Sequence, residues 1–309
     1  MIGFLSECAF LSRNNPNHRR RHGSVSHDFP KTARIAIHKL RLLPPIPVEL
    51  QRLLEIVRDE QTTLDQLYVA VENSPALTAR LLGLANSAYF GQSGAVSTIR
   101  QAIYQVLGLN TVKSLVYTQL LSQTLDTSRC AAFQGEQFWC ESLLTAIFAQ
   151  RLAGQAKVDA GVAYTTGLLA NLGLLALVHT FPEEMAAMFR AAEESGVRLS
   201  QQLRGELGMD QYRAGAWLAS RWHFPDALCL AIMSMADGGS QAASPLASVV
   251  RLARCLAQQC YRGEDDRQAY EALAEELGLE ADGLPRVLEA VKAKRLELAE
   301  SARLLGNPP

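Results

Sequence analysis

Apolar residues recur along this chain at three- and four-residue spacing from about residue 40 onward. The first two stripes with this spacing are Leu50, Leu53, Leu54 and Val57, followed by Leu64, Leu67, Tyr68 and Val71. Such stripes place the apolar side chains on one face of a helix. No segment shows convincing strand patterning, so the pattern predicts an all-α fold.

Polar residues at the start of each stripe are typical of helix caps. Three pairs fit this role: Thr63 with Gln66, Ser74 with Pro75, and Thr98 with Gln101. A Ser or Thr side chain accepts a bond from the first amides of a helix, and Pro is tolerated at its first position. The helix that begins after Thr98 is expected to end at Gly108, and another to begin near Asn110.

Further helices follow a low-periodicity joint at Asp126–Glu136. Two buried helices are expected at Phe138–Leu152 and Tyr164–Leu177. The later ones are expected at Glu183–Ser195, Leu199–Leu207, Asp210–Arg221, Pro225–Met235, Ser244–Cys260, Arg267–Leu277 and Leu284–Leu305.

Composition indicates a self-sufficient core and excludes some partners. Of the 309 residues 48% are hydrophobic, and the 30 basic residues nearly cancel the 31 acidic ones, giving a net charge of -1. This balance gives no general attraction to nucleic acid or to an anionic membrane, so no nucleic-acid partner is expected. The cysteines lack zinc-site spacing and disulfide-scaffold density, which favours reduced thiols and a cytoplasmic location. They are Cys8, Cys130, Cys140, Cys229, Cys255 and Cys260.

Neither apolar segment of note predicts membrane insertion. Gly167–Val178 is shorter than the roughly 20 residues of a spanning helix and contains Asn171, so it is interpreted as a buried core helix. At the N-terminus the basic group Arg19–Arg21 follows an apolar stretch, the reverse of a secretory signal. Residues 1–30, which include His18, His22 and His27, are predicted to be a disordered leader.

A set of ordered motifs runs from Leu43-Pro-Pro-Ile-Pro47 through Asn73–Leu82, Leu84–Gly91, Ile99–Ile103, Leu107–Asn110, Phe138-Trp139, Gly167–Leu169, Gly215–Leu218, Arg221-Trp222 and Leu252-Ala253. Together these motifs resemble the HDOD family, bacterial all-helical relatives of the HD metal-dependent phosphohydrolases. Asn73 departs from the family pattern, which more often has Asp there. The resemblance implies an N-terminal helical bundle packed on a degenerate HD-like helical domain, followed by C-terminal helices. The expected boundaries are 31–128, 129–262 and 263–309.

The resemblance also implies where metal ligands would stand. The ligand positions of the HD pattern fall on Glu141, Ala170, Asn171, Gln211, the vicinity of Met235 and Ala236, and Arg254. None is a His or an Asp. Alanine cannot ligate, amides bind transition metals poorly, and arginine adds a positive charge where a cation would sit. We therefore expect no metal, no cofactor and no HD-type catalysis.

Glu141 and Arg254 occupy two positions that would once have converged on one cation. A buried charge is costly unless it is paired, so we hypothesise a direct or water-bridged contact between them, with Asn171 as a further partner. The alternative, in which both side chains reach solvent, is equally compatible with the sequence.

Other residues allow two interpretations. Asn86, Ser87, Tyr89 and Phe90 follow a predicted helix, either as a helix end satisfied by polar side chains or as a partner-facing or interdomain turn. Trp139, Trp217 and Trp222 are most simply packing residues. His179 and His223 are most simply capping or packing histidines.

The expected function is a non-catalytic signal-transduction or regulatory module that acts by protein binding. The resemblance associates it with two-component or cyclic-dinucleotide signalling, and without a recognised receiver or output domain we expect a protein partner in trans. Two alternatives stay open: a residual phosphohydrolase with a rearranged site, and a sensor whose emptied metal pocket binds a nucleotide.

Overall fold

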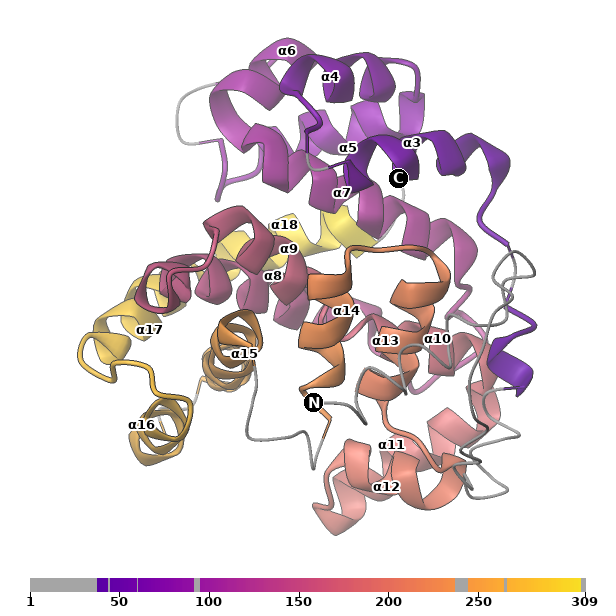
Figure 1. Cartoon of the computed structure of the whole chain (residues 1–309), viewed down its shortest axis with the longest axis vertical. Helices are drawn as coiled ribbons and strands as arrows, with labels where there is room; N and C mark the ends of the chain where they lie inside the picture. The colour runs from indigo at the N-terminus through magenta and orange to yellow at the C-terminus, as the bar shows by residue number, and fades with distance from the viewer. Residues whose placement is uncertain are drawn as a thin grey trace, which may run out of the picture.

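The computed structural model describes residues 38–43, 45–59, 61–91, 95–236, 244–263 and 266–306. Within those ranges every regular element is a helix and no strand occurs, which confirms the all-α prediction (Figure 1). The leader predicted for residues 1–30 lies outside the described residues.

Six elements form an N-terminal lobe at the top of Figure 1. They are α3 (Val48–Arg58), α4 (Leu64–Glu72), α5 (Pro75–Ala85), α6 (Ile99–Gln101), the π-helix η1 (Ala102–Leu107) and α7 (Gly108–Thr124). The predicted capping box at Thr63 and Gln66 is present, and Ser74 caps α5. Thr98 likewise accepts a hydrogen bond from the amide of Gln101.

The rest of the chain forms a second lobe and a C-terminal group. The second lobe comprises α8 (Gly135–Leu152), the 3-10 helix η2 (Ala153–Ala156), α9 (Ala160–Leu169), α10 (Leu172–Thr180), α11 (Pro182–Ser195), α12 (Leu199–Leu207), α13 (Gln211–Arg221), α14 (Asp226–Met233) and α15 (Pro245–Arg262). The C-terminal helices are α16 (Arg267–Glu276), α17 (Leu284–Lys292) and α18 (Arg295–Gly306).

Three helices expected to be continuous are interrupted. The helix expected at Tyr164–Leu177 ends at Leu169 and restarts at Leu172, because α10 must turn to lie against α13. The one expected at Leu284–Leu305 breaks between α17 and α18, since α17 packs on α15 and α8 whereas α18 also reaches α5 and α7. The helix before Gly108 contains a π-helical turn.

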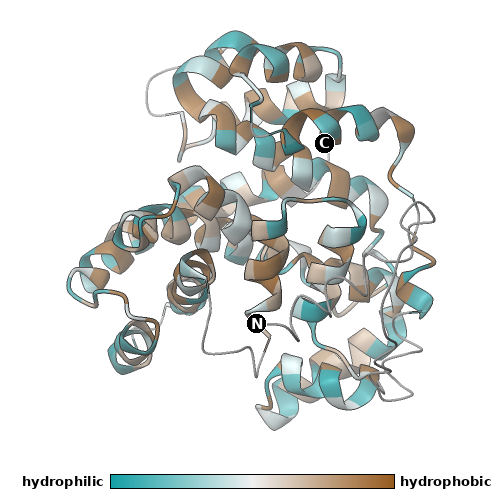
Figure 2. Ribbon diagram, viewed as in Figure 1, coloured by the Kyte–Doolittle hydropathy of each residue, from teal (hydrophilic) through white to brown (hydrophobic). Residues whose placement is uncertain are grey.

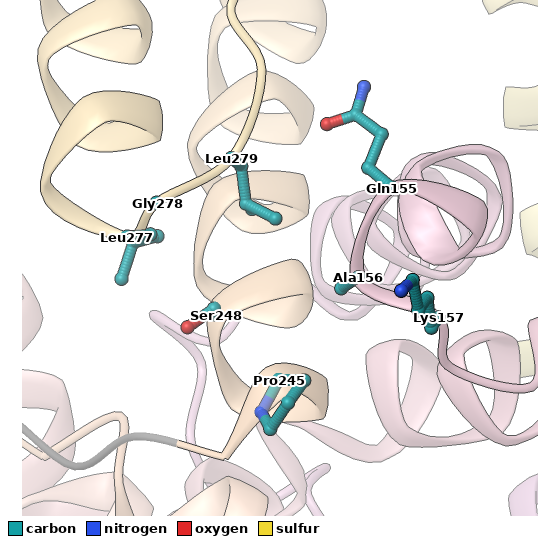
Figure 3. A pocket seen from close by; sticks show the side chains of 8 residues that line it. All are labelled: Gln155, Ala156, Lys157, Pro245, Ser248, Leu277, Gly278 and Leu279. Carbon is teal, nitrogen blue, oxygen red and sulfur yellow. The ribbon is translucent and has the colours of Figure 1, made fainter.

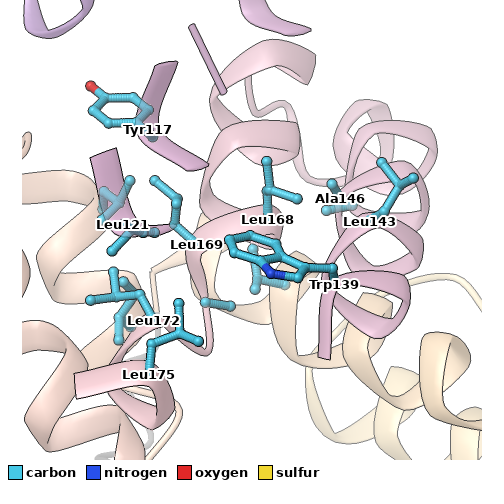
Figure 4. Close-up of a cluster of buried hydrophobic side chains, with 14 of the residues drawn as sticks. Tyr117, Leu121, Trp139, Leu143, Ala146, Leu168, Leu169, Leu172 and Leu175 are labelled. Carbon is cyan, nitrogen blue, oxygen red and sulfur yellow. The ribbon is translucent and has the colours of Figure 1, made fainter. Parts of the chain in front are cut away.

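A continuous apolar core runs between the helices. Figure 4 shows the indole of Trp139, on α8, beside Leu168 and Leu169 of α9, with Leu172 of α10 close by. Trp139, Trp217 and Trp222 are all buried, as expected for packing residues. Figure 2 shows how central and peripheral helices differ: the ribbon of the central helix α14 is largely brown and white, whereas that of the peripheral α16 mixes teal with brown.

One segment, Ala160–Thr180, is apolar and long enough to cross a membrane, but 83% of it is buried inside the fold. It covers α9, the break at residues 170–171 and α10. Such burial is typical of a core helix in a soluble protein, because this segment's apolar side chains are already covered by protein.

The last helix, α18, contacts both lobes. It packs on α8 and also on α5 and α7 of the N-terminal lobe. The hydroxyl of Ser301 donates to that of Ser87 at 2.9 Å, and both side chains are buried. At the rim, Arg303 pairs with Glu136 at 3.2 Å. The two lobes are therefore joined by α18, by the direct packing of α7 on α9 and by the chain connection between α7 and α8.

Candidate functional site

The positions that the HD pattern would use as ligands come from five segments of the second lobe. Glu141 lies on α8, Asn171 just before α10, Gln211 at the start of α13, and Arg254 in the middle of α15. Met235 and Ala236 are buried just after α14, and Ala170 is buried beside Asn171. The parent helices pack in a chain of contacts, α10 on α13, α13 on α14, α14 on α15, and α15 on α8.

Two glycines bring α10 and α13 unusually close together. A Cβ added at Gly173 would overlap the carbonyl oxygen of Gln211 and the amide of Gly215. The amide of Gly173 would in turn lie 3.1 Å from a Cβ at Gly215. This close crossing holds Asn171, two residues before Gly173, next to the first turn of α13.

The guanidinium of Arg254 is enclosed by protein but retains some accessible surface. Its Cζ lies 5.0 Å from the ring centroid of Tyr212, a cation–π distance. Burial lowers the pKa of Arg254 from its ordinary value, while the negative charge of Glu141 acts in the opposite direction. A second cation, Arg198 at the start of α12, adds to the lowering of that pKa.

The direct contact predicted between Glu141 and Arg254 is absent. Among the described residues no hydrogen bond or ion pair joins these two side chains, although they interact electrostatically. Glu141 instead accepts a hydrogen bond from Gln137, one turn earlier on α8, at 2.8 Å. The geometry differs from the expectation because the ring of Tyr212, and not a carboxylate, faces the guanidinium. A water-bridged contact stays a prediction.

Three polar atoms around this site are buried without a partner among the described residues. They are Oδ1 of Asn171, Oε1 of Gln211 and the hydroxyl of Tyr212. Gln211 and Tyr212 are 4% and 3% exposed, so these groups have lost water without gaining a protein partner. Buried polar groups are normally satisfied, so each such exception needs an explanation.

The acidic residue at the N-terminus of α13 makes its hydrogen bonds and its ion pair with groups other than Arg254. Asp210 is 0% exposed, and its Oδ1 accepts from the amides of Tyr212 and Arg213 at the N-terminus of α13. Its Oδ2 pairs with Arg204 at 3.3 Å. Asp210 is therefore a helix cap and ion-pair partner, and its hydrogen bonds do not extend to Arg254.

The side chains at the former ligand positions do not fit the metal that HD-type catalysis requires. In the part of the chain that the structure describes, no three His, Cys, Asp or Glu residues gather where they could hold an ion. Ala170 has no donor atom, Asn171 and Gln211 offer only amides, and Arg254 would repel a cation. Metal-bound hydroxide chemistry thus has no support from these residues.

The turn after α5 is satisfied largely within the chain. Asn86 donates to the carbonyls of Leu82 and Val96, and Ser87 donates to that of Leu84. Tyr89 and Phe90 make an edge-to-face ring contact, and both are half-buried. The buried hydroxyl of Ser87 already joins α18, whereas Asn86 is exposed, so a partner-facing role stays a prediction for the exposed side of this turn.

A cavity of about 270 Å³ lies away from the former ligand positions. Figure 3 shows it between η2, the start of α15 and the turn after α16, with Lys157 as its charged lining residue. None of the predicted site residues lines it.

Tyr212 and Arg198 were not singled out from the sequence. Tyr212 directly follows Gln211 in the sequence, and this adjacency is the signal that could have identified it. Arg198 carries no motif signal, because only the fold brings the start of α12 toward α15. His179, expected to be a capping or packing residue, accepts a hydrogen bond at 2.9 Å from the amide of Asp126 in the connection between the lobes.

The chain belongs to the HDOD domain family, whose model matches residues 43–237. That match covers the N-terminal lobe and the second lobe as far as α14, and it ends before the Leu252-Ala253 motif on α15.

Three known proteins are similar to this chain. A "putative phosphohydrolase" from Shewanella amazonensis SB2B has a solved structure with a TM-score of 0.73 and 26% identity, covering 86% of this chain and 97% of its own. A "putative signal transduction protein" from Marinobacter aquaeolei VT8 gives a TM-score of 0.73 at 23% identity, covering 92% and 68%. An uncharacterized protein of Treponema pallidum (strain Nichols) is 26% identical over 188 residues. That region is 60% of this chain, which spans only 36% of the curated relative's length.

Proposed function

We propose that this HDOD chain is a non-catalytic regulatory module that acts in the cytoplasm by binding a protein partner. One observation supports the proposal: Arg254 stands at the position that the family pattern aligns with a metal ligand, and its guanidinium is largely enclosed and lies 5.0 Å from the Tyr212 ring. A fixed positive charge there opposes a metal ion, and the amides of Asn171 and Gln211 cannot compensate. The family membership supports a regulatory role.

The competing function is metal-dependent phosphodiester hydrolysis, which the name of the Shewanella relative suggests. We expect the chain, purified without an affinity tag, to hold no stoichiometric transition metal. We also expect it to hydrolyse bis(p-nitrophenyl) phosphate no faster than the blank with added manganese, magnesium or iron. One tightly held ion per chain, together with hydrolysis that a chelator abolishes, would refute the proposal.

A variant with restored ligands provides the matched control. It carries Glu141→His, Ala170→His, Asn171→Asp, Gln211→His and Arg254→Asp. If these positions converge as the family pattern implies, this variant should take up metal that the natural chain does not. Failure of a folded variant to bind any metal would contradict the assignment of the positions.

The partner class is tested by using the chain as bait in its native host. The proposal expects enrichment of a two-component or cyclic-dinucleotide signalling protein relative to an unrelated helical bait. Purified bait and candidate should then form a complex of defined stoichiometry. A chain that binds none of the enriched candidates directly would argue against an adaptor.

A further inference from the structure

The guanidinium of Arg254 has five N–H donors and uses none of them on the described residues. No hydrogen bond or ion pair involves it there, and its only specific protein contact is the face of the Tyr212 ring at 5.0 Å. A guanidinium taken largely out of water without hydrogen-bond acceptors is costly. Arg254 is not fully buried, so part of the residue remains accessible to solvent.

Tyr212 and the amide residues at the aligned ligand positions offer further groups that could bind an anion. The hydroxyl of Tyr212 is buried without a partner. Asn171 and Gln211 also have unsatisfied side chains, and a half-turn of each amide presents its NH2 donors in place of its oxygen. Arg198, which is exposed, brings a second positive charge close enough to disfavour the charged form of Arg254.

The acidic groups nearby do not neutralise this cluster. Glu141 attracts Arg254 electrostatically, but its carboxylate contacts Gln137 and not the guanidinium. Asp210 is occupied by Arg204 and by the first amides of α13. Two arginines against one carboxylate leave a net formal charge of +1, so the cluster favours an anion.

We propose that Arg254, the Tyr212 hydroxyl and Arg198 form a binding site for a tetrahedral oxyanion, a phosphate group, at the position of the lost metal. A guanidinium can bind two oxygens of either a carboxylate or a phosphate. A third donor and a second cation favour phosphate, because a phosphate group has more oxygens and more negative charge than a carboxylate. The phosphate is inorganic or belongs to a small nucleotide, two sources that share this chemistry.

This inference goes beyond the proposed function and shares with it the metal-free state of the site. An HD enzyme would hold a cation and its substrate phosphate together, whereas here the protein's own cation would hold the anion directly. Phosphate binding should therefore persist in excess chelator. The phosphate titration therefore tests the anion site, and the hydrolysis assay separately tests the non-catalytic function.

Isothermal titration of the whole chain tests the site with sodium phosphate, adenosine monophosphate and sodium acetate at one ionic strength, with chelator present. We expect saturable phosphate binding to the natural chain and no saturable acetate binding. Tighter binding of the monophosphate would assign a nucleotide as source, and equal or weaker binding would assign inorganic phosphate. Equal affinity for acetate, or no saturable phosphate binding, would overturn the proposal.

Single substitutions test where on the protein the phosphate binds. Arg254→Met should weaken phosphate binding about 10- to 100-fold, because it removes hydrogen bonds to a charged group. Tyr212→Phe keeps the ring but loses the hydroxyl, and should weaken binding about two- to tenfold. Arg251→Met is the matched control, since Arg251 lies on the same helix and pairs with Glu276 at 3.4 Å. It removes the same charge but should leave the affinity nearly unchanged.

Arg198→Met keeps the test decisive if Arg254→Met fails to fold. Arg198 is exposed, so this variant should fold like the natural chain while binding phosphate several-fold more weakly. Unchanged affinity in Arg198→Met and Tyr212→Phe, or equal losses in Arg251→Met, would place any bound anion elsewhere and overturn the site.

Discussion

Two enclosed arginines, one in each lobe, have different surroundings. Arg80 on α5 is 3% exposed and donates one hydrogen bond, to the side-chain oxygen of Gln119 on α7. Its Nε and Nη2 are buried without partners, and burial lowers its pKa. Arg254 keeps accessible surface, and among the described residues it makes a contact with a ring face but no hydrogen bond or ion pair. A sealed guanidinium depends on its one protein partner, whereas an accessible one can complete its hydrogen bonds with a ligand.

The largest expected effect on stability comes from a change at the close crossing of α10 and α13. Gly173→Ala would force α10 and α13 apart, because the new methyl group would overlap the backbone of Gln211 and Gly215. We expect a loss of about 3 kcal/mol in the free energy of unfolding, at the upper end for overpacking. Urea denaturation measures this. The control is Gly205→Ala on α12, where the space is open and a small gain is expected. Equal effects would show that the crossing is not tight.

The next effect tests the sealed arginine. Gln119→Leu removes the acceptor of Arg80 and should lower the free energy of unfolding by about 2 kcal/mol. Adding Arg80→Met to that variant removes the uncompensated charge, so the double variant should recover to within about 1 kcal/mol of the natural chain. An additive loss in the double variant would mean that the two side chains are not coupled.

Arg254→Met should cost less than about 1 kcal/mol, since it breaks a cation–π contact but no ion pair. The comparison with Gln119→Leu is made in the same denaturation experiment without phosphate. A loss of several kcal/mol would indicate a buried bridge to Glu141, such as one through water, and would make the two arginines alike.

The smallest effect lies at the joint between the lobes. The hydroxyl of Ser128 lowers the pKa of the Asp126 carboxyl by hydrogen bonding to it at 2.6 Å. Because the folded-state pKa is below the unfolded one, this stabilisation is present above about pH 4 and is lost as the pH falls through the folded value. Ser128→Ala should flatten the acid side of the stability profile slightly. An unchanged profile between pH 2 and about 5 would contradict the contact.

The sequence predicted the features that depend on interactions between residues close together in the chain. Stripes and caps located the helices because a cap such as Thr63 acts on its own first turn. The breaks near Asn171 and Lys294 could not be predicted in this way, because each arises where a helix changes its tertiary neighbours. The burial of Arg80 was missed for the same reason: its spacing along α5 does not identify which helix will cover it.

For the site, the family pattern indicated Glu141, Asn171, Gln211 and Arg254, which lie on or beside helices of the second lobe. Their role as former ligand positions stays a prediction. The direct pairing of the first and last of these was wrong, because a linear alignment gives positions but not side-chain directions. Tyr212 lies where the carboxylate was expected to be, over the guanidinium.

The contact between α18 and both lobes affects how this protein can be cut into fragments. The family match ends at residue 237, before α15 and α18, which together cover α8. A fragment cut at that boundary would leave the covered face of α8 open to water and break the Ser87 to Ser301 hydrogen bond. The stretch that a family search recognises is therefore shorter than the stretch that must be expressed for this protein to fold.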